Sequence, residues 1–373
     1  MTHQKASIVV QSPGRINLIG EHTDYNEGYI LPAAIDKKTT MRLRRNGSSS
    51  TVQVMANDVK ESFSFDLLHI SPIQGGWQNY ILGVVHELQQ LGAQLEGFEA
   101  TFESNVPIGA GLSSSAALEC SLAFALNELF NLGFDKWQLI KASQMAEHHF
   151  VGVKCGIMDQ FASLMGKKDH AMLLDCRSLE FQYQPLQLET HQLLLLNTNV
   201  SHTHATSAYN DRRAACEEGV AILRKTGLEL TSLRDLSLDE LTKHETSLPT
   251  PIYRRCYHVV SENDRVLAAV QALQQNDLTT LGSLLYESHF SLRNDYEVSC
   301  PELDFLVNQT LNKDYIPGSR MMGGGFGGCT LQIIEKEWSD AFVEQVSEKY
   351  FKAFGIDLHP YSVSIVDGTK EVY

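Results

Sequence analysis

The sequence predicts an α+β fold, because segments of strand character and of helix character interleave without the regular alternation of a doubly wound sheet. Strands are indicated where β-branched or alternating apolar residues recur over short runs, and helices where apolar residues recur at helical spacing. The chain has 373 residues, of which 43% are hydrophobic and 20% charged. This composition is typical of a globular protein, and the length suffices for two domains.

The first half of the chain mixes strands with helices. The expected strands are 6–11, 39–43, 51–55 and 98–103. The expected helices are 79–91, 113–132, 137–150 and 157–165. The strongest of these is 113–132, where serines at the start precede apolar residues at helical spacing.

The second half is rich in helices. The expected helices are 208–226, 257–275, 278–291 and 338–354, and the expected strands are 191–198, 330–334 and 359–366. The apolar run from Leu193 to Leu196 is typical of a buried strand. The weak signal over 179–189 is the best candidate boundary, so we expect two domains, 1–187 and 188–373.

Charge and cysteine usage exclude several classes of protein. The net charge is -15 and there is no block of Lys or Arg, which argues against nucleic acid or a membrane surface as a partner. The seven cysteines are scattered and form no CxxC pair, so a disulfide framework or zinc finger is not expected. The start of the chain is polar and no apolar run approaches a membrane span. We therefore expect a cytoplasmic protein.

A dense polar turn follows the first expected strand. The run from Ser12 to Gly28 carries, among its polar residues, Arg15, Glu21, His22, Asp24 and Tyr25. Two carboxylates, a guanidinium and an imidazole packed this closely call for a polyhydroxylated or charged ligand, because carboxylates accept pairs of hydrogen bonds from neighbouring sugar hydroxyls. The alternative is a surface turn with a few ion pairs.

A glycine-rich loop with three serines opens the expected helix 113–132. Gly109 and Gly111 let the backbone approach a phosphate closely, and the free N–H groups at a helix N-terminus favour an anion. The hydroxyls of residues 113–115 can donate to phosphate oxygens or ligate Mg²⁺. The Walker pattern is absent, so this is not the phosphate loop that the Walker pattern marks. The alternative is that these serines only cap the helix.

Two acids flank a short connection between predicted helices. Asp159 stands in the first turn of the expected helix 157–165, and Glu147 stands near the end of the preceding one. The connection 151–154 can bring both acids to one pocket, where one could bind a metal while the other serves as a base. Compensation of the helix dipole is the alternative for Asp159.

The remaining motifs carry less information. The run from Ser319 to Cys329 contains GxGxxG, but an expected strand follows it, so a dinucleotide fold is rejected. Its glycines instead imply close backbone approach to a ligand or another loop. His202 with His204, and His148 with His149, do not fit HExxH, and we expect no metal use there.

Together these motifs strongly resemble those of the GHMP small-molecule kinases, and within them the enzymes that phosphorylate galactose. The matching segments are 14–26, 109–117, 155–161, 175–180, 296–304 and 323–329. The glycine–serine loop alone marks only the superfamily, whereas the first segment with the others is highly specific. The resemblance covers nearly the whole chain. It implies an N-terminal domain like the second domain of ribosomal protein S5, a ferredoxin-like C-terminal domain, and a site in the cleft between them.

The resemblance also implies the reaction: ATP and α-D-galactose give α-D-galactose 1-phosphate and ADP. Asp159 would be the base facing the C1 hydroxyl, and Arg15 would hold the alkoxide and the transferring phosphoryl group. The sugar would be lined by Glu21, His22, Asp24, Gly156, Asp159 and Tyr209. ATP would be bound by Gly109, Gly111, Leu112, Ser113, Ser114, Ser115, Ala116 and Trp77, and Mg²⁺ by Ser115 and Glu147. The alternative for Trp77 is that it is simply an aromatic residue of the core. The protein is expected to be a monomer.

Three rival functions stay open at the level of sequence. The first is a related kinase for N-acetylgalactosamine or arabinose, although the turn 24–28 fits the galactose enzymes better than the shortened turn of the N-acetylgalactosamine enzymes. The second is a non-catalytic galactose/ATP sensor; the sensor paralogue lacks the Ser-Ala pair that Ser115 and Ala116 form here. The third is a structural protein, in which several glycine, serine and acid motifs would have to coincide by chance.

Overall fold

Three β-sheets organise residues 6–201 and 205–372, the parts of the chain that the computed structural model describes. The first sheet contains, in order across it, β13 (Lys370–Glu371), β1 (Ser7–Asn17), β3 (Pro32–Arg45), β6 (Phe98–Ser104), β4 (Thr51–Ala56) and β5 (Glu61–Asp66). The second contains β10 (Gly318–Met321), β11 (Gly327–Glu335), β9 (His191–Ser201) and β12 (His359–Val363). The third contains β2 (Tyr29–Ile30), β7 (His170–Asp175) and β8 (Phe181–Pro185).

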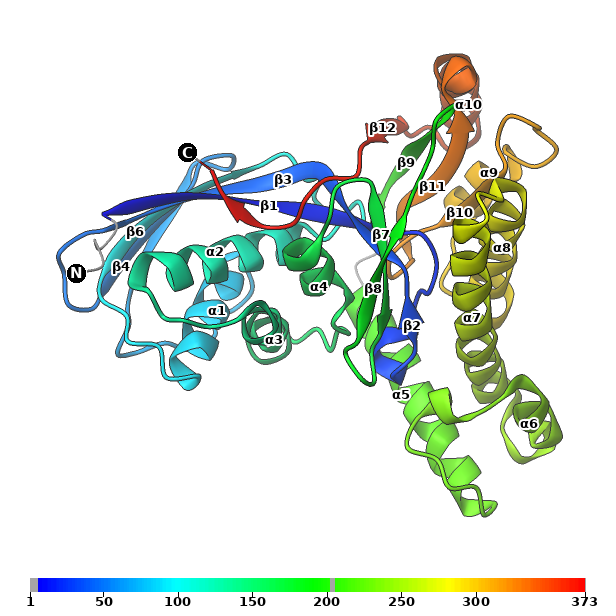
Figure 1. The fold of residues 1–373 in the computed structure, drawn as a ribbon, viewed down its shortest axis with the longest axis horizontal. Helices are drawn as coiled ribbons and strands as arrows, with labels where there is room; N and C mark the ends of the chain where they lie inside the picture. The colour runs from blue at the N-terminus through cyan, green and yellow to red at the C-terminus, as the bar shows by residue number, and fades with distance from the viewer. Residues whose placement is uncertain (1–5, 202–204, 373) are drawn as a thin grey trace.

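One face of the first sheet is covered by four helices (Figure 1). They are α1 (Gln78–Gln90), α2 (Ser114–Phe130), α3 (Lys136–Ala146) and α4 (Met158–Met165). α2 is apolar almost all round and lies against β1 and β3, as a helix in the centre of a core should. The opposite face carries exposed ion pairs across neighbouring strands, including Arg42 with Glu103 at 2.9 Å. The four helices therefore form one layer against a single face of the first sheet.

The second sheet is buried on both faces. Along β9, Leu193 and Leu195 join the apolar cluster that includes residues of α7 (Thr250–Gln274) and α8 (Leu278–Ser291). Leu194 and Leu196 point the other way, toward α9 (Pro301–Asn308) and α10 (Ser339–Phe354). Alternation between two covered faces explains the continuous apolar run. The prediction of a buried strand here is confirmed.

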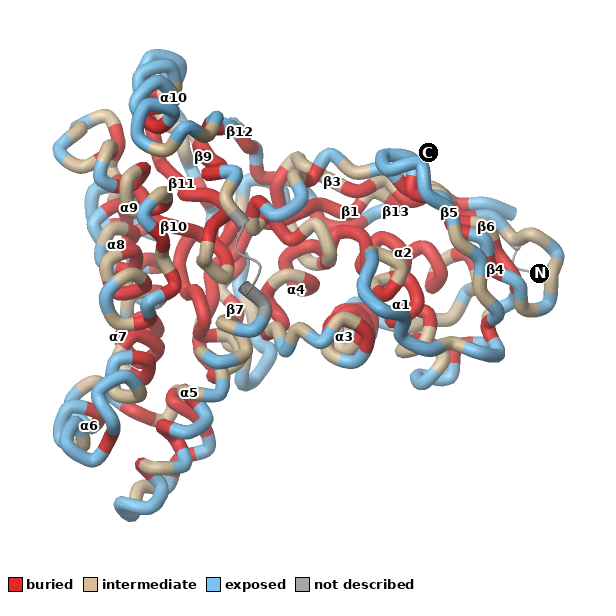
Figure 2. Tube along the Cα trace, turned by 180° about the vertical axis from the view of Figure 1, so that it is seen from behind, coloured by how far each residue is buried: buried red, intermediate tan, exposed pale blue. Residues whose placement is uncertain are grey.

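A helical arm projects from the second sheet (Figure 1). It consists of α5 (Ala205–Lys225), α6 (Leu238–Lys243) and the beginning of α7. The arm has an apolar cluster of its own, in which Leu223, Leu233 and Leu241 are fully buried. Figure 2 shows that buried residues concentrate in β1, β3, the second sheet and the helices packed against them, such as α2 and α7, whereas the outer sides of the arm and of α10 are exposed. The first turns of α5 lie next to β9 at the base of the arm, and they contribute Tyr209 to the cavity described below.

The α+β prediction is confirmed, but several elements were missed or misplaced. No expected element covers β2, β5, β7, β8, β10, β13, α6 or α9. The predicted helix 137–150 ends its α-helical part at Ala146 and continues as a π-helical turn, Glu147–Val151. α7 begins at Thr250 instead of 257 because Pro251 fits its first turn. β1 runs on to Asn17, so the polar turn starts inside a strand.

Three further expectations concern cysteines, membranes and histidines. All seven cysteines are free thiols. None of the helices in the described ranges combines the length and the apolar character that crossing a membrane requires. His202 and His204 lie outside the described residues.

Candidate active site

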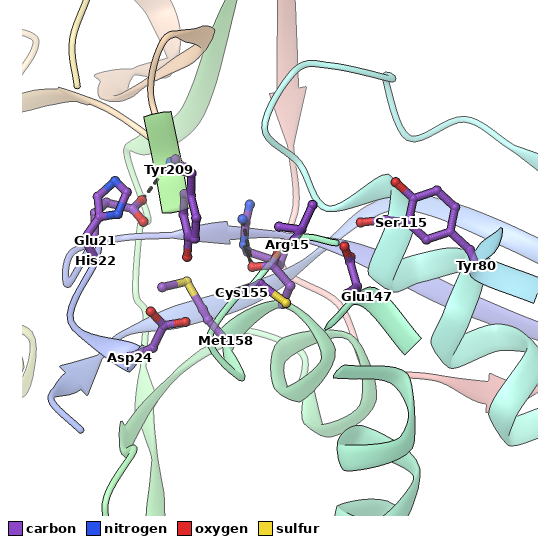
Figure 3. A pocket seen from close by; sticks show the side chains of 15 residues that line it. Arg15, Glu21, His22, Asp24, Tyr80, Ser115, Glu147, Cys155, Met158 and Tyr209 are labelled. Carbon is purple, nitrogen blue, oxygen red and sulfur yellow. Dashed lines mark hydrogen bonds and ion pairs between the residues drawn. The ribbon is translucent and has the colours of Figure 1, made fainter. Parts of the chain in front are cut away.

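A polar cavity of about 270 Å³ lies where β1, α2 and α4 meet the first turns of α5 and the turn between β10 and β11 (Figure 3). Its lining consists of Arg15, Glu21, His22, Asp24, Tyr80, Ser115, Glu147, Val153, Cys155, Gly156, Met158, Asp159, Tyr209, Gly323 and Gly324. All the side chains proposed for the sugar, the base and the metal are among them. The cavity thus joins segments that are far apart in the sequence.

The lining is ordered along the cavity. In Figure 3, Glu21, His22, Asp24 and Tyr209 lie toward one end, while Ser115, Glu147 and Tyr80 lie toward the other. Arg15 lies between the two groups. A ligand with hydroxyl groups at the first end and a phosphate chain at the second would meet this guanidinium at their junction.

Arg15 and Asp159 form the central ion pair. A bulge in β1 between Pro13 and Arg15 re-aims the strand, as bulges beside active sites often do. Nε and Nη2 of Arg15 each lie 2.9 Å from Oδ1 of Asp159, and Nη1 donates to the carbonyl of Gly111 at 2.5 Å. The Arg15 side chain is 6% exposed and that of Asp159 is 28% exposed. The carboxylate is therefore held in orientation while it remains open to the cavity.

Glu21 is held by the glycine-rich turn that follows β10. Its Oε1 accepts from the Gly323 N–H at 2.8 Å and from Nη1 of Arg320 at 3.2 Å. Arg320 is fully buried and also donates to the carbonyls of Asn17 and Leu18. The sequence interpretation missed Arg320, although it stands inside the motif from Ser319 to Cys329. The buried guanidinium fixes both the end of β1 and the carboxylate.

His22 presents one nitrogen to the cavity. Its backbone is in the left-handed region at φ 63, and its Nδ1 lies 2.7 Å from the hydroxyl of Tyr25. Rings of Tyr209 and Tyr296 also pack against the imidazole. Burial lowers the pKa of His22 to about 3, so the ring is neutral. A backbone hydrogen bond with Gly324 opposes the shift without cancelling it, and Nε2 itself is buried beside the cavity.

Asp24 and Gly156 are in direct contact. Burial, and secondly the charge of Asp159, raise the pKa of Asp24 to about 6 in the ligand-free protein. The Asp24 carboxylate is so close to Gly156 that a Cβ at position 156 would overlap its Oδ2. A side chain at position 156 would therefore have to displace this carboxylate, which gives the resemblance-based assignment of Gly156 to the pocket a physical basis.

Glu147 and Ser115 lie together at the far end of the cavity. The π-helical turn Glu147–Val151 places Glu147 inside, where its carboxylate accepts a hydrogen bond from Ser115. π-helical turns are frequent at functional sites. Burial raises the pKa of Glu147 to about 7, and Asp159 adds to the effect. The expectation that a short connection brings Glu147 and Asp159 to one pocket is confirmed.

The raised pKa of Glu147 predicts a pH-dependent stability. Its folded pKa lies above its ordinary value, so its contribution to stability is full at pH 4 and is lost as the pH rises through about 7. Glu147→Gln removes this loss, and we expect it to stabilise the ligand-free protein at pH 8 by about 1–3 kcal/mol, with little effect near pH 5. Thermal unfolding at both pH values measures this difference. The control is Glu344→Gln on the exposed side of α10; an equal Tm change at both pH values for Glu147→Gln would refute the prediction.

The glycine–serine loop is not built as a simple helix cap. Ser113 precedes α2 in the left-handed region at φ 59, and its side chain makes no capping hydrogen bond to the described residues. Its Oγ is buried and unpaired within the same part of the chain. The Ser115 hydroxyl bonds to Glu147 instead. The capping alternative is therefore wrong for Ser113, which does not line the cavity.

The glycine-rich turn 323–328 packs against other backbone. Gly323 and Gly328 approach the main chain of Ala110 and Gly111 in the glycine–serine loop. Gly325 has φ 83 and lies so close to the Val298 carbonyl that no side chain would fit. The expectation was that these glycines approach a ligand or another loop closely, and their approach to another loop is confirmed.

The aromatic at the phosphate end is Tyr80. Trp77, one turn earlier, does not line the cavity; it packs edge-on against Phe63 and Phe102 and donates from Nε1 to Glu61 at 2.9 Å. These contacts agree with the alternative that Trp77 is a core aromatic residue. A contact of Trp77 with adenine stays a prediction. The sequence interpretation gave no role to Tyr80, Cys155 or Met158 in the lining, although Cys155 and Met158 lie in the segment 155–161 that it singled out.

Comparison with known families matches three parts of the chain. The family model described as "GHMP kinases N terminal domain" matches residues 79–167, and the model "GHMP kinases C terminal" matches 269–352. The model "Galactokinase galactose-binding signature" matches residues 2–45. A crystal structure of mevalonate kinase, with a TM-score of 0.66 at 17% identity over 96% of this chain and 99% of its own, shares the fold alone. The fold and the site therefore define a GHMP kinase.

Full-length relatives narrow the family. The galactokinase of Thermotoga maritima is 42% identical over 97% of this chain and 99% of its own, and that of Clostridium acetobutylicum is 42% identical over 97% and 94%. The crystal structure of Lactococcus lactis galactokinase complexed with galactose has a TM-score of 0.94 at 35% identity, covering 99% of this chain and 96% of its own. The chain belongs to the galactokinase family.

Proposed function

We propose that the protein transfers the γ-phosphoryl group of ATP to the C1 hydroxyl of α-D-galactose, giving α-D-galactose 1-phosphate and ADP. The observation that carries this proposal is the paired Arg15 and Asp159 between a carboxylate-rich end and a phosphate-loop end of one cavity. Membership of the galactokinase family supports the substrate. A non-catalytic sensor or a kinase for another sugar is not favoured.

The sugar end of the cavity suits a molecule with several hydroxyl groups. Glu21 and Asp24 supply carboxylate oxygens, which accept hydrogen bonds from neighbouring hydroxyls. Nε2 of neutral His22 adds one further polar atom beside the cavity. The ring of Tyr209 closes this end, since it packs against His22 and Tyr25. These groups orient the sugar so that its C1 hydroxyl faces Asp159.

The transfer needs one proton acceptor and one stabilised oxyanion. Asp159 takes the proton of the C1 hydroxyl, and the sugar oxygen forms a bond to the γ-phosphorus as the bond to the β–γ bridging oxygen breaks. Arg15 lies between the two ends of the cavity, where it would stabilise the negative charge that develops on the sugar oxygen and the phosphoryl group. ADP leaves with the bridging oxygen.

The phosphate end fits the triphosphate of ATP and a magnesium ion. The backbone N–H groups at the N-terminus of α2, beside Ser115, would bind phosphate oxygens. No group of three or more His, Cys, Asp or Glu side chains in the described ranges is placed to hold a metal. Ser115 and Glu147 offer two oxygens, which suits Mg²⁺ because it is usually held by one or two carboxylates together with phosphates and water. When bound, Mg²⁺ neutralises phosphate charge.

Ser115→Ala is expected to impair use of Mg·ATP more than binding of galactose. The substitution removes one proposed metal ligand and the hydrogen bond to Glu147, while the sugar residues lie at the other end of the cavity. We expect KM for Mg·ATP to rise about tenfold, the cost of losing one hydrogen bond to a charged group. Steady-state kinetics with each substrate varied in turn measures the split. Equal loss for both substrates would instead indicate a folding defect.

Gly156→Ala is expected to raise KM for galactose. The added methyl group would overlap Asp24 and displace its carboxylate, which costs a charged hydrogen bond to the sugar, about tenfold to a hundredfold in binding. The control is Lys154→Ala, because that side chain is exposed in the same connection. Calorimetric titration with galactose tests both variants. Wild-type affinity in Gly156→Ala would exclude Asp24 from sugar binding.

Substrate profiling tests the proposed function itself. ADP release with Mg·ATP is measured with galactose, N-acetylgalactosamine, glucose and arabinose at equal concentrations. Release that depends on galactose and far exceeds the other sugars is expected. Faster turnover of N-acetylgalactosamine or arabinose would reassign the substrate. No turnover with any sugar, although galactose raises Tm, would identify a sensor.

We further propose the organisation and setting of the protein. A division into 1–187 and 188–373 falls in the connection between β8 and β9, and β13 then returns to the first sheet. The seven free thiols support a reducing, cytoplasmic compartment. One chain supplies every proposed site residue, which supports a functional monomer.

A further inference from the structure

A buried polar contact joins the two helices that carry the phosphate loop and the base. Glu119 lies one turn beyond Ser115 in α2, and Gln160 directly follows Asp159 in α4. Both residues are 0% exposed. Nε2 of Gln160 donates to Oε2 of Glu119 at 3.3 Å. Neither side chain lines the cavity, so neither touches the substrates.

The contact between Glu119 and Gln160 has two acceptor oxygens for which no hydrogen-bond donor is present in the described chain. Oε1 of Glu119 and Oε1 of Gln160 are both buried, and neither has a hydrogen-bond partner among the described residues. Buried polar atoms in folded proteins are rarely left without partners. An ionised Glu119 would only add a buried charge, whereas a proton on Glu119 would supply a donor to a pair that has two unpaired acceptors.

The surroundings of Glu119 favour the protonated form. Burial raises the pKa of this carboxyl well above its ordinary range, and the charges of Glu147 and Asp159 act in the same direction, while the hydrogen bond from Gln160 opposes the shift without cancelling it. Two acids already face the cavity nearby, so a neutral Glu119 avoids a third negative charge close to where a triphosphate would bind.

We infer that Glu119 is a positioning residue: as a neutral carboxylic acid paired with the side-chain amide of Gln160, it fixes α2 against α4. The pair thereby sets the position of Ser115 relative to Asp159. This inference rests on the proposed function, because the alignment matters only if phosphoryl transfer occurs between those two groups. A shift of about 1 Å in such a geometry costs about a hundredfold in rate.

Three variants separate a neutral pair from a charged one. Glu119→Gln gives two amides, which can exchange hydrogen bonds as an acid and an amide do. The double variant E119Q/Q160E exchanges the two side chains and restores one acid and one amide. Gln160→Leu removes the partner and leaves Glu119 unpaired. Each variant is made in the full chain and assayed with Mg·ATP and galactose beside the parent protein.

The expected results are specific to positioning. Glu119→Gln and E119Q/Q160E keep kcat within about threefold of the parent, whereas Gln160→Leu lowers kcat at least about tenfold with KM for galactose unchanged. Loss of activity in both Glu119→Gln and the exchanged double variant, with the parent active, would overturn the inference and show that an ionised Glu119 is needed. Full kcat in Gln160→Leu would overturn it as well. If Gln160→Leu does not fold, the first two variants decide. An inactive parent would instead contradict the proposed function.

Discussion

Asp159→Asn is expected to reduce kcat for galactose phosphorylation by about 10²–10⁴-fold, the usual contribution of a positioned general base. Asparagine has nearly the same shape, and its side-chain oxygen can still accept from Nε and Nη2 of Arg15. It cannot take the C1 proton, because the neutral amide is a very weak base. KM for galactose should change little, since the groups assigned to sugar binding remain. Steady-state kinetics and calorimetric binding of galactose measure these effects.

A matched control separates this effect from a general loss of structure. Asp340→Asn is the same substitution at an exposed position in the first turn of α10, and we expect it to leave kcat unchanged. Asp159→Asn should unfold cooperatively, although with some loss of Tm because Arg15 loses its counter-charge. Near-wild-type turnover of Asp159→Asn would show that the base has been assigned wrongly.

Arg15→Met is expected to have the second largest effect, a fall in kcat of about 10²–10³-fold. The substitution keeps most of the aliphatic volume but removes the guanidinium that lies between the sugar and phosphate ends of the cavity. It also leaves the Gly111 carbonyl and Asp159 without their donor. The loss should fall on kcat more than on KM, because the charge stabilised by Arg15 develops only in the transition state.

Arg15→Lys tests whether charge or geometry is the more important. Lysine keeps a positive charge but lacks the planar fork that contacts Asp159 and Gly111 together. We expect kcat of this variant to lie between those of the parent and Arg15→Met. If Arg15→Met retained full turnover, the placement of Arg15 between the two substrates would have no catalytic meaning.

The parts of the fold that could be predicted are those with regular burial. β9 was recognisable because both of its faces are covered, so Leu193 to Leu196 form an unbroken apolar run. β8 was missed because Gln184 is its buried residue while Gln182 and Tyr183 are exposed, which reverses the usual pattern. β10 was missed because it is short and buries Arg320. Tertiary contacts, which the local sequence does not display, decide such elements.

The residues of the site also divide into those that could be predicted from the sequence and those that could not. Residues that share a short motif, such as Glu21 with Asp24 or the serines before α2, could be assigned together from their spacing. Partners that the fold brings from a distance could not, and Arg320 beside Glu21 and Gln160 beside Glu119 are examples. Tyr80 is a third case, because an aromatic residue in an amphipathic helix gives no sign of facing a cavity. Chemical motifs were thus predictable, and the residues that hold them in place were not.

The identity of the phosphorylated product tests the central claim most directly. Galactose and Mg·ATP are incubated with the protein, and phosphorus–proton correlation by NMR locates the phosphate on the sugar. The account predicts a single ester at C1 in the α configuration, formed in equal amount to ADP, because Asp159 and Arg15 face that hydroxyl at the junction of the two ends of the cavity. A phosphate at another carbon, or ADP released without any sugar phosphate, would contradict it.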